Sequence, residues 1–331
     1  MRHAHLLVCG LVSAAVAGGC VDAWLHGAAA NDCRPRRPRP VVNLTNMGPC
    51  QFEPERLAFA GEATEQARCL VRPVGVRARL GPVPDTLPDA LAVRVGRAAA
   101  MPSRRAVAMV LAEMGLDGQF ADTLFNPVSR AQDGDPFAPS ARYFVIHDTS
   151  GPQLRRFPDD IDGTARFNNL ANFRCTDGWS IAHAVINRSG DIYQGHDFEV
   201  PWRATKFERA QRFGTDLKGL FLHVEMIQPR RGRGGTLAPS PGFTAAQYDR
   251  LALLYAMASL RAGTWLIPAF HATIDGGVRN GHDDPQNFEL ATFAKSLEEL
   301  ARRFEKADEP QVSEALPPRN QDGELGERTD R

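Results

Sequence analysis

Three short segments, far apart in the chain, carry side chains that can bind a metal ion or transfer protons. They are Tyr143-Phe144-Val145-Ile146-His147, Leu222-His223-Val224-Glu225-Met226, and His271 followed by His282-Asp283-Asp284-Pro285. Each polar group lies at or just past a run of apolar or β-branched residues, so buried strands are expected to present these groups at one edge of a sheet. Two histidines and a carboxylate form a zinc set that leaves one position for water. A separate carboxylate such as Glu225 can then act as general base, and the pattern predicts metal-assisted hydrolysis.

The strands that must position these groups alternate with helices along the chain. Residues 143–148 and 219–227 are predicted strands, and residues 182–194 form a predicted hairpin around the turn at Gly190. Thr244 and Gln247 form a capping box before a long amphipathic helix, and residues 288–304 form a closing helix. Strands interleaved with helices predict an α/β domain with a mixed sheet.

The order and context of these segments resemble the zinc-dependent N-acetylmuramoyl-L-alanine amidases, the family that also includes the peptidoglycan recognition proteins. The resemblance runs from about Arg142 to about Lys306. Its parts are Val145-Ile146-His147, Ser180-Ile181-Ala182-His183-Ala184-Val185-Ile186, Gly190-Asp191-Ile192-Tyr193-Gln194, His223-Val224-Glu225, and His271 with Asp284-Pro285. It implies a mixed central sheet flanked by helices, with the site at one edge.

The resemblance also implies roles for individual residues. His147, His271 and Asp284 match the family's zinc ligands, and Glu225 matches its catalytic glutamate. His282 and Asp283 remain alternatives for the third ligand, because the interval from His271 is longer than usual; Asp275-Gly276-Gly277 is expected to form the extra turn. If Asp284 is the ligand, His282 lies where the family has a basic residue, and in its protonated form it would stabilise the oxyanion.

Three further residues are predicted to contact substrate. Strand alternation directs His223 to the same face as Glu225, where it would hydrogen-bond the substrate or support a ligand. His183 is expected to line the groove or support the site, and Trp202 either stacks on sugar or packs in the core. The arginines at positions 230, 231 and 233 form either a substrate-facing basic rim or a solvated loop.

The activity implied by the resemblance is zinc-dependent hydrolysis of the amide bond between N-acetylmuramic acid and L-alanine, in peptidoglycan or its fragments (muropeptides). The alternatives are a non-catalytic peptidoglycan-binding protein and a zinc peptidase that cuts within the stem peptide. We expect a monomer. Lys+Arg and Asp+Glu both total 39, so no overall charge attracts the chain to nucleic acid.

The N-terminus predicts export. Residues 1–20 form an expected signal peptide with an apolar stretch from Leu6 to Ala17. Ala17-Gly18-Gly19-Cys20 resembles a lipobox, which would make the protein a periplasmic lipoprotein anchored at Cys20; the alternative is cleavage near Ala28-Ala29-Ala30 and release as a soluble protein.

The rest of the chain divides by composition and cysteine usage. Residues 21–40 are a predicted Pro/Arg-rich tether, 41–135 a small accessory region of unknown role, 140–306 the catalytic domain, and 307–331 a disordered tail. Within the accessory region a helix is expected after Ser103. Four cysteines remain for an oxidising compartment, namely Cys33, Cys50, Cys69 and Cys175. These four cysteines can be paired in three ways, and one of these ways includes a Cys50–Cys69 bond.

Overall fold

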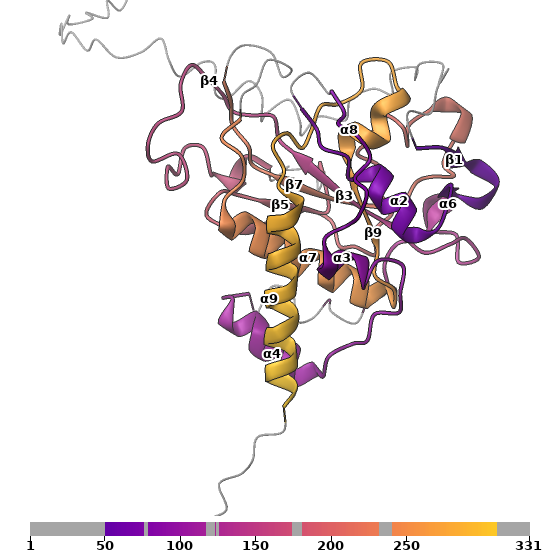
Figure 1. The fold of residues 1–331 in the computed structure, drawn as a ribbon, viewed down its shortest axis with the longest axis horizontal. Coiled ribbons are helices and arrows are strands. Elements are labelled where there is room, and N and C mark those ends of the chain that lie inside the picture. The colour runs from indigo at the N-terminus through magenta and orange to yellow at the C-terminus, as the bar shows by residue number, and fades with distance from the viewer. Residues whose placement is uncertain are drawn as a thin grey trace, which may run out of the picture.

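The structure is a computed structural model, and it describes residues 50–75, 79–116, 123, 126–173, 181–231 and 240–309 (Figure 1). The predicted signal peptide, the tether, and the cysteines Cys20, Cys33 and Cys175 lie outside the described residues, as does the tail beyond Glu309. Among the residues described, none of the helices has the length and apolar content needed to cross a membrane.

A five-stranded sheet in the order β6-β5-β7-β3-β9 forms the centre of the molecule. Its strands are β3 (Tyr143–Asp148), β5 (Ala184–Ile186), β6 (Ile192–Gln194), β7 (Phe221–Met226) and β9 (Ile267–Phe270). β5, β7, β3 and β9 run parallel, whereas β6 pairs antiparallel with β5 in the predicted hairpin. The sheet is therefore mixed and flanked by helices, which confirms the predicted fold class.

The parallel strands bring their carboxyl ends to one edge of the sheet. His147 lies opposite Glu225 in the β3–β7 register, and Ile146 lies opposite Phe270 at the end of β9. His271 follows Phe270 directly, as the first residue of α8 (His271–Ile274). Crevices at the carboxyl ends of parallel strands are the usual ligand sites of such sheets. The chain thus places the predicted chemistry at this edge.

Helices cover one face of the sheet. α7 (Ala245–Ala262) packs against α9 (Leu290–Asp308), and α9 also contacts α4 (Arg104–Glu113) (Figure 1). The ring of Phe144 on β3 lies 5.3 Å from that of Tyr255 on α7. The predicted caps are present: Thr244 and Gln247 form a capping box, and the Ser103 side chain accepts a hydrogen bond from the backbone of α4. α9 continues to Asp308, into the segment predicted as a disordered tail.

The N-terminal residues cover the opposite face. They contribute β1 (Phe52–Glu53), β2 (Ala58–Phe59) and α2 (Ala63–Leu70), tied together by a disulfide between Cys50 and Cys69. The hydroxyl of Tyr143 accepts a hydrogen bond from the Phe59 backbone and donates one to Gln66, both at 2.8 Å. The region predicted as accessory therefore joins the same hydrophobic core as the sheet. A parallel sheet needs cover on both faces, and this segment supplies the second cover.

Short elements complete the described fold. They are η2 (Pro54–Arg56), α3 (Asp89–Ala92), α6 (Ala131–Gly134), β4 (Gln153–Leu154), η4 (Leu170–Phe173), η5 (Gln211–Phe213), β8 (Arg230–Arg231) and η6 (Asp275–Gly277). β4 and β8 form a small parallel pair. The 3-10 turn η6 is the extra turn predicted after His271.

Candidate metal centre and catalytic site

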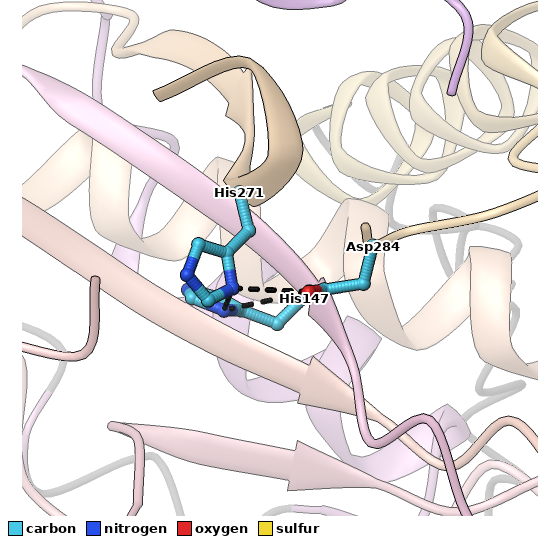
Figure 2. A group of neighbouring side chains, drawn as sticks. All are labelled: His147, His271 and Asp284. Atoms are coloured by element: carbon cyan, nitrogen blue, oxygen red, sulfur yellow. Dashed lines mark hydrogen bonds and ion pairs between the residues drawn. The ribbon is translucent and has the colours of Figure 1, made fainter. Parts of the chain in front are cut away.

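Three predicted ligands meet at the carboxyl edge of the sheet (Figure 2). The Nδ1 atoms of His147 and His271 lie 2.8 Å apart, and the carboxylate of Asp284 lies 3.2 Å from the Nδ1 of His271. The Nδ1 of His147 is 3.7 Å from the Oδ2 of Asp284. All three side chains are buried. Their donor atoms thus converge on one point and can hold a metal ion together.

The chemistry of this group fits zinc. Two imidazole nitrogens and one carboxylate oxygen form a common three-ligand zinc set. Both histidines present Nδ1 to the common point, while each Nε2 faces a buried partner: His223 for His147, and Asp275 for His271. Such outer partners orient the imidazoles of zinc sites. The alternative third ligand Asp283 belongs to neither of the metal-binding groups found among the described residues.

The charges of the three side chains differ. Burial lowers the pKa of His147, and the neighbouring His271 lowers it further, so His147 is neutral. Burial also lowers the pKa of His271, but Asp284 and Asp275 outweigh it and raise the pKa well above the usual value. Burial raises the pKa of Asp284, yet His271 outweighs this and keeps the carboxylate ionised. The carboxylates that contact His271 therefore favour positive charge close to the point where these atoms converge, as a cation site requires.

A buried chain of polar side chains leads away from His147. The Nε2 of His147 lies 3.0 Å from the Nδ1 of His223. The Nε2 of His223 lies 3.2 Å from Oε2 and 3.3 Å from Oε1 of Glu208. His223 and Glu208 have no exposed surface. The structure thus places His223 behind a ligand, which is the supporting alternative of its two predicted roles, and a buried His223 does not face substrate.

His271 has a shorter link to a carboxylate. Its Nε2 lies 3.2 Å from the Oδ2 of Asp275. The same oxygen lies 2.8 Å from the Nδ1 of His282, whose ring stacks on that of His271 with centroids 4.0 Å apart. His271, Asp275 and His282 form a second group that could bind a metal. Because it shares His271 with the first group, we interpret Asp275 as the support of that ligand.

His282 is the exposed histidine of this cluster, with 40% of its side chain accessible. Burial of the ring and the neighbouring His271 lower its pKa, although Asp275 opposes this. A lowered pKa disfavours the protonated form that the predicted oxyanion role requires. The Asp275 contact leaves Nε2 as the ring nitrogen available to substrate.

Glu225 lies beside the converging ligands. Its Oε1 is 3.8 Å from the Nδ1 of His147, and 13% of its side chain is exposed. The register between β3 and β7 explains this position, because His147 and Glu225 are directly opposite. A carboxylate at this distance and with this access can exchange protons with a water held at the site.

Arg230 corrects the predicted basic rim. Its side chain is fully buried, and its Nη2 donates to both carboxylate oxygens of Asp148 at 2.7 and 2.8 Å. The backbone of Asp148 in turn donates to Asp284 at 3.1 Å. Arg230 therefore belongs to the interior behind Asp284 rather than to a substrate-facing surface. Arg231 is exposed, and position 233 lies outside the described residues.

The other predicted contact residues lie farther along the same interior. His183 is buried: its Nδ1 accepts a hydrogen bond from the His223 backbone, and its Nε2 lies 3.1 Å from the carbonyl oxygen of Val200. His183 thus contacts His223 from behind, which is the supporting alternative of its two predicted roles. Trp202 is half-buried, and its ring lies 4.3 Å from that of His196, with the indole N–H donating to the Ile181 carbonyl.

Sequence reasoning missed Glu208 and Asp275. Asp275 was assigned only to a turn. Glu208 had a signal in the pattern Thr205-Lys206-Phe207-Glu208, since a Thr-x-x-Glu spacing is typical of a capping box. The structure contains the reciprocal bonds of that motif, from the Glu208 backbone to the Thr205 hydroxyl and from the Thr205 backbone to the Glu208 carboxylate.

A comparison with known protein families points to the same part of the chain as the converging side chains do. Residues 137–287 match the family model of N-acetylmuramoyl-L-alanine amidase, a range that contains the converging ligands and Glu225. Neither the curated proteins nor the solved structures gave a match. The match over residues 137–287 supports the assignment of this domain to the type 2 N-acetylmuramoyl-L-alanine amidase family, whose general activity is directed at peptidoglycan.

Proposed function

We propose that the protein is a zinc-dependent enzyme that hydrolyses the amide bond between N-acetylmuramic acid and L-alanine, in peptidoglycan or its fragments. The observation that carries this proposal is the convergence of His147, His271 and Asp284 with Glu225 beside them. The family match supports the general activity, and the donor set supports the metal.

In this proposal His147 and His271 hold the ion through Nδ1 and Asp284 through its carboxylate. Zinc supplies a Lewis acid and lowers the pKa of bound water when it is present. Glu225 accepts the proton of the attacking water and returns it to the leaving amine of L-alanine. His282 keeps its Nδ1 against Asp275 and presents Nε2 to the carbonyl oxygen; it would stabilise the oxyanion only in the doubly protonated form, which its lowered pKa disfavours.

We further infer that the protein works outside the cytoplasm, in the periplasm. The disulfide between Cys50 and Cys69 supports an oxidising compartment, because structural disulfides are rare in the cytosol. Residues 1–20 would direct export, with Cys20 as a lipid anchor or with release of a soluble form. The mass of the intact protein tests the anchor: a chain that begins at a diacylated Cys20 supports it, whereas a chain without lipid that begins near Ala30 indicates the soluble form.

Product analysis tests the reaction. Digested cell wall should yield glycan with a free lactyl carboxyl group and stem peptides with a free L-alanine amine, as measured by mass spectrometry. Shortened stem peptides would identify a peptidase instead. Zinc binding and wall binding without any product would identify a non-catalytic binding protein.

Glu225→Gln tests the assignment of the base. It should lower the turnover by about 10²- to 10⁴-fold, because general base catalysis contributes that much. Zinc content, measured by atomic emission, should stay at the wild-type level, whereas His147→Ala should lose both zinc and activity. Near-normal turnover of Glu225→Gln would contradict the proposed role.

A further inference from the structure

We propose that Glu208 and His223 are positioning residues that place a proton on the Nε2 of His147 and so leave its Nδ1 free to bind the metal. The inference rests on the proposed zinc site. It concerns how this chain prepares one ligand, and it assigns a role to two buried residues that do not touch substrate.

The chain of proton positions starts at Glu208. Its Oε2 accepts hydrogen bonds from the backbone of Ala204 at 3.2 Å, the backbone of Thr205 at 2.9 Å and the hydroxyl of Thr205 at 2.8 Å. With three donors on it, this oxygen acts only as an acceptor of hydrogen bonds. The Nε2 of His223, which lies against this carboxylate, must therefore carry a proton.

The proton on the Nε2 of His223 determines what its other nitrogen does. A neutral imidazole with one protonated nitrogen has an acceptor at the other. The Nδ1 of His223 thus accepts from the Nε2 of His147 across 3.0 Å. With its proton on Nε2, neutral His147 carries a lone pair on Nδ1, the atom that faces His271 and Asp284. Tautomers follow from hydrogen-bond partners in this way, and here every partner is a protein atom.

His183 keeps the intermediate ring in place. Its Nδ1 accepts the backbone N–H of His223 at 3.0 Å, and the two rings stack with centroids 5.8 Å apart and planes 19° from parallel. His147 and His223 are 1% and 0% exposed, so bulk water cannot substitute for a missing partner. If His223 carried its proton on Nδ1, that nitrogen would be a donor facing the Nε2 of His147. The Nε2 of His147 would then have to accept, and the proton of His147 would move to its Nδ1.

Glu208→Gln tests this directly, because the amide has almost the shape of the carboxylate. Its carbonyl oxygen should stay on the three donors, which turns an N–H toward the Nε2 of His223 and reverses the relay. We expect zinc affinity, measured by competition with a chromophoric chelator, to fall by about 10- to 100-fold, as for loss of other outer partners of zinc ligands. Asp197→Asn is the matched control: its carboxylate binds Arg261, and zinc affinity should stay within about 2-fold.

A second variant separates the relay from a merely structural effect. In His223→Asn the side-chain carbonyl can accept from His147 whatever stands at position 208. Glu208→Gln should then cost no more than about 2-fold in zinc affinity in this background. An equal loss in both backgrounds would mean that Glu208 acts on folding alone, and would overturn the proposal.

A measurement on the unaltered protein decides the matter even if a variant does not fold. The ¹⁵N chemical shifts of the metal-free protein should identify His223 as the neutral Nε2–H tautomer. An Nδ1–H or doubly protonated His223 would overturn the proposal. None of these readouts uses peptidoglycan, so a failure to cleave the wall would contradict the proposed function and leave this inference standing, and the reverse also holds.

Discussion

The two histidines that meet at the metal position are supported in different ways. His271 faces ionised carboxylates directly, Asp284 on one nitrogen and Asp275 on the other, and its pKa is raised. His147 faces the ring of His223, with the carboxylate of Glu208 behind that ring, and burial together with the neighbouring His271 lowers the pKa of His147. A carboxylate in contact makes an imidazole basic, whereas one placed behind a second imidazole only orients the proton. In the proposed metal site, one histidine is therefore tuned by charge and the other by tautomer.

Position in the sheet explains this difference. His147 lies on the interior strand β3, and its neighbour on the same face is a residue of the adjacent strand β7, His223, opposite Val145. His271 begins a helix after the edge strand β9, so the turn at Asp275 can fold back onto it. The two supports meet in one segment, because the backbones of Lys206 and Phe207, the two residues just before Glu208, donate hydrogen bonds to Asp275.

Asp284 serves both histidines, so its replacement should have the largest effect. Asp284→Asn should weaken zinc binding by more than the roughly 100-fold upper range for an outer partner, because a charged ligand is lost. Chelator competition measures this. The neighbouring Asp283 accepts from the Gln286 side chain instead, and Asp283→Asn should retain zinc. A larger loss in Asp283→Asn than in Asp284→Asn would reassign the third ligand.

Asp275→Asn removes the charge that supports His271. We expect about a 10- to 100-fold loss of zinc affinity, as for other outer carboxylates. Unlike the loss expected for Glu208→Gln, the loss of zinc affinity in Asp275→Asn should persist in the His223→Asn background, because Asp275 supports His271 and His223 supports His147. Asp162→Asn, which alters an ion pair with Arg188 outside the ligand group, is the control. If the loss in Asp275→Asn disappears in the His223→Asn background, the two supports are not independent.

Thr205→Val should have the smallest effect. It removes one of the three hydrogen bonds to the Oε2 of Glu208 and keeps the two from the backbone. We expect a loss of about 1–3 kcal/mol in the free energy of unfolding in urea, because a buried acceptor loses a donor. Thr164→Val, where the hydroxyl donates to the exposed Asp160, should cost less. Equal costs would show that burial of Glu208 does not strengthen its contacts.

Much of the fold could be predicted because its signals are local. Alternation and apolar runs marked β3, β7 and the β5–β6 hairpin, and the capping residues Ser103 and Thr244 marked where α4 and α7 begin. The packing of β1, β2 and α2 against the second face of the sheet could not be predicted. It depends on Phe59 and Gln66 meeting Tyr143 across 84 and 77 positions of the chain, a separation that no local pattern reports.

For the site, the sequence by itself placed His147 and Glu225 near the ends of two predicted strands, and parallel strands end at one edge. The resemblance to the amidases added His271 and Asp284 to this set. Only the tertiary structure decided what stands behind them. It buried Arg230 against Asp148, enclosed His183 and His223, and brought Glu208 and Asp275 to the two imidazoles. The physical reason is that a buried polar group must find a partner wherever the folded chain offers one, and that partner is set by the path of the loops rather than by spacing in the sequence.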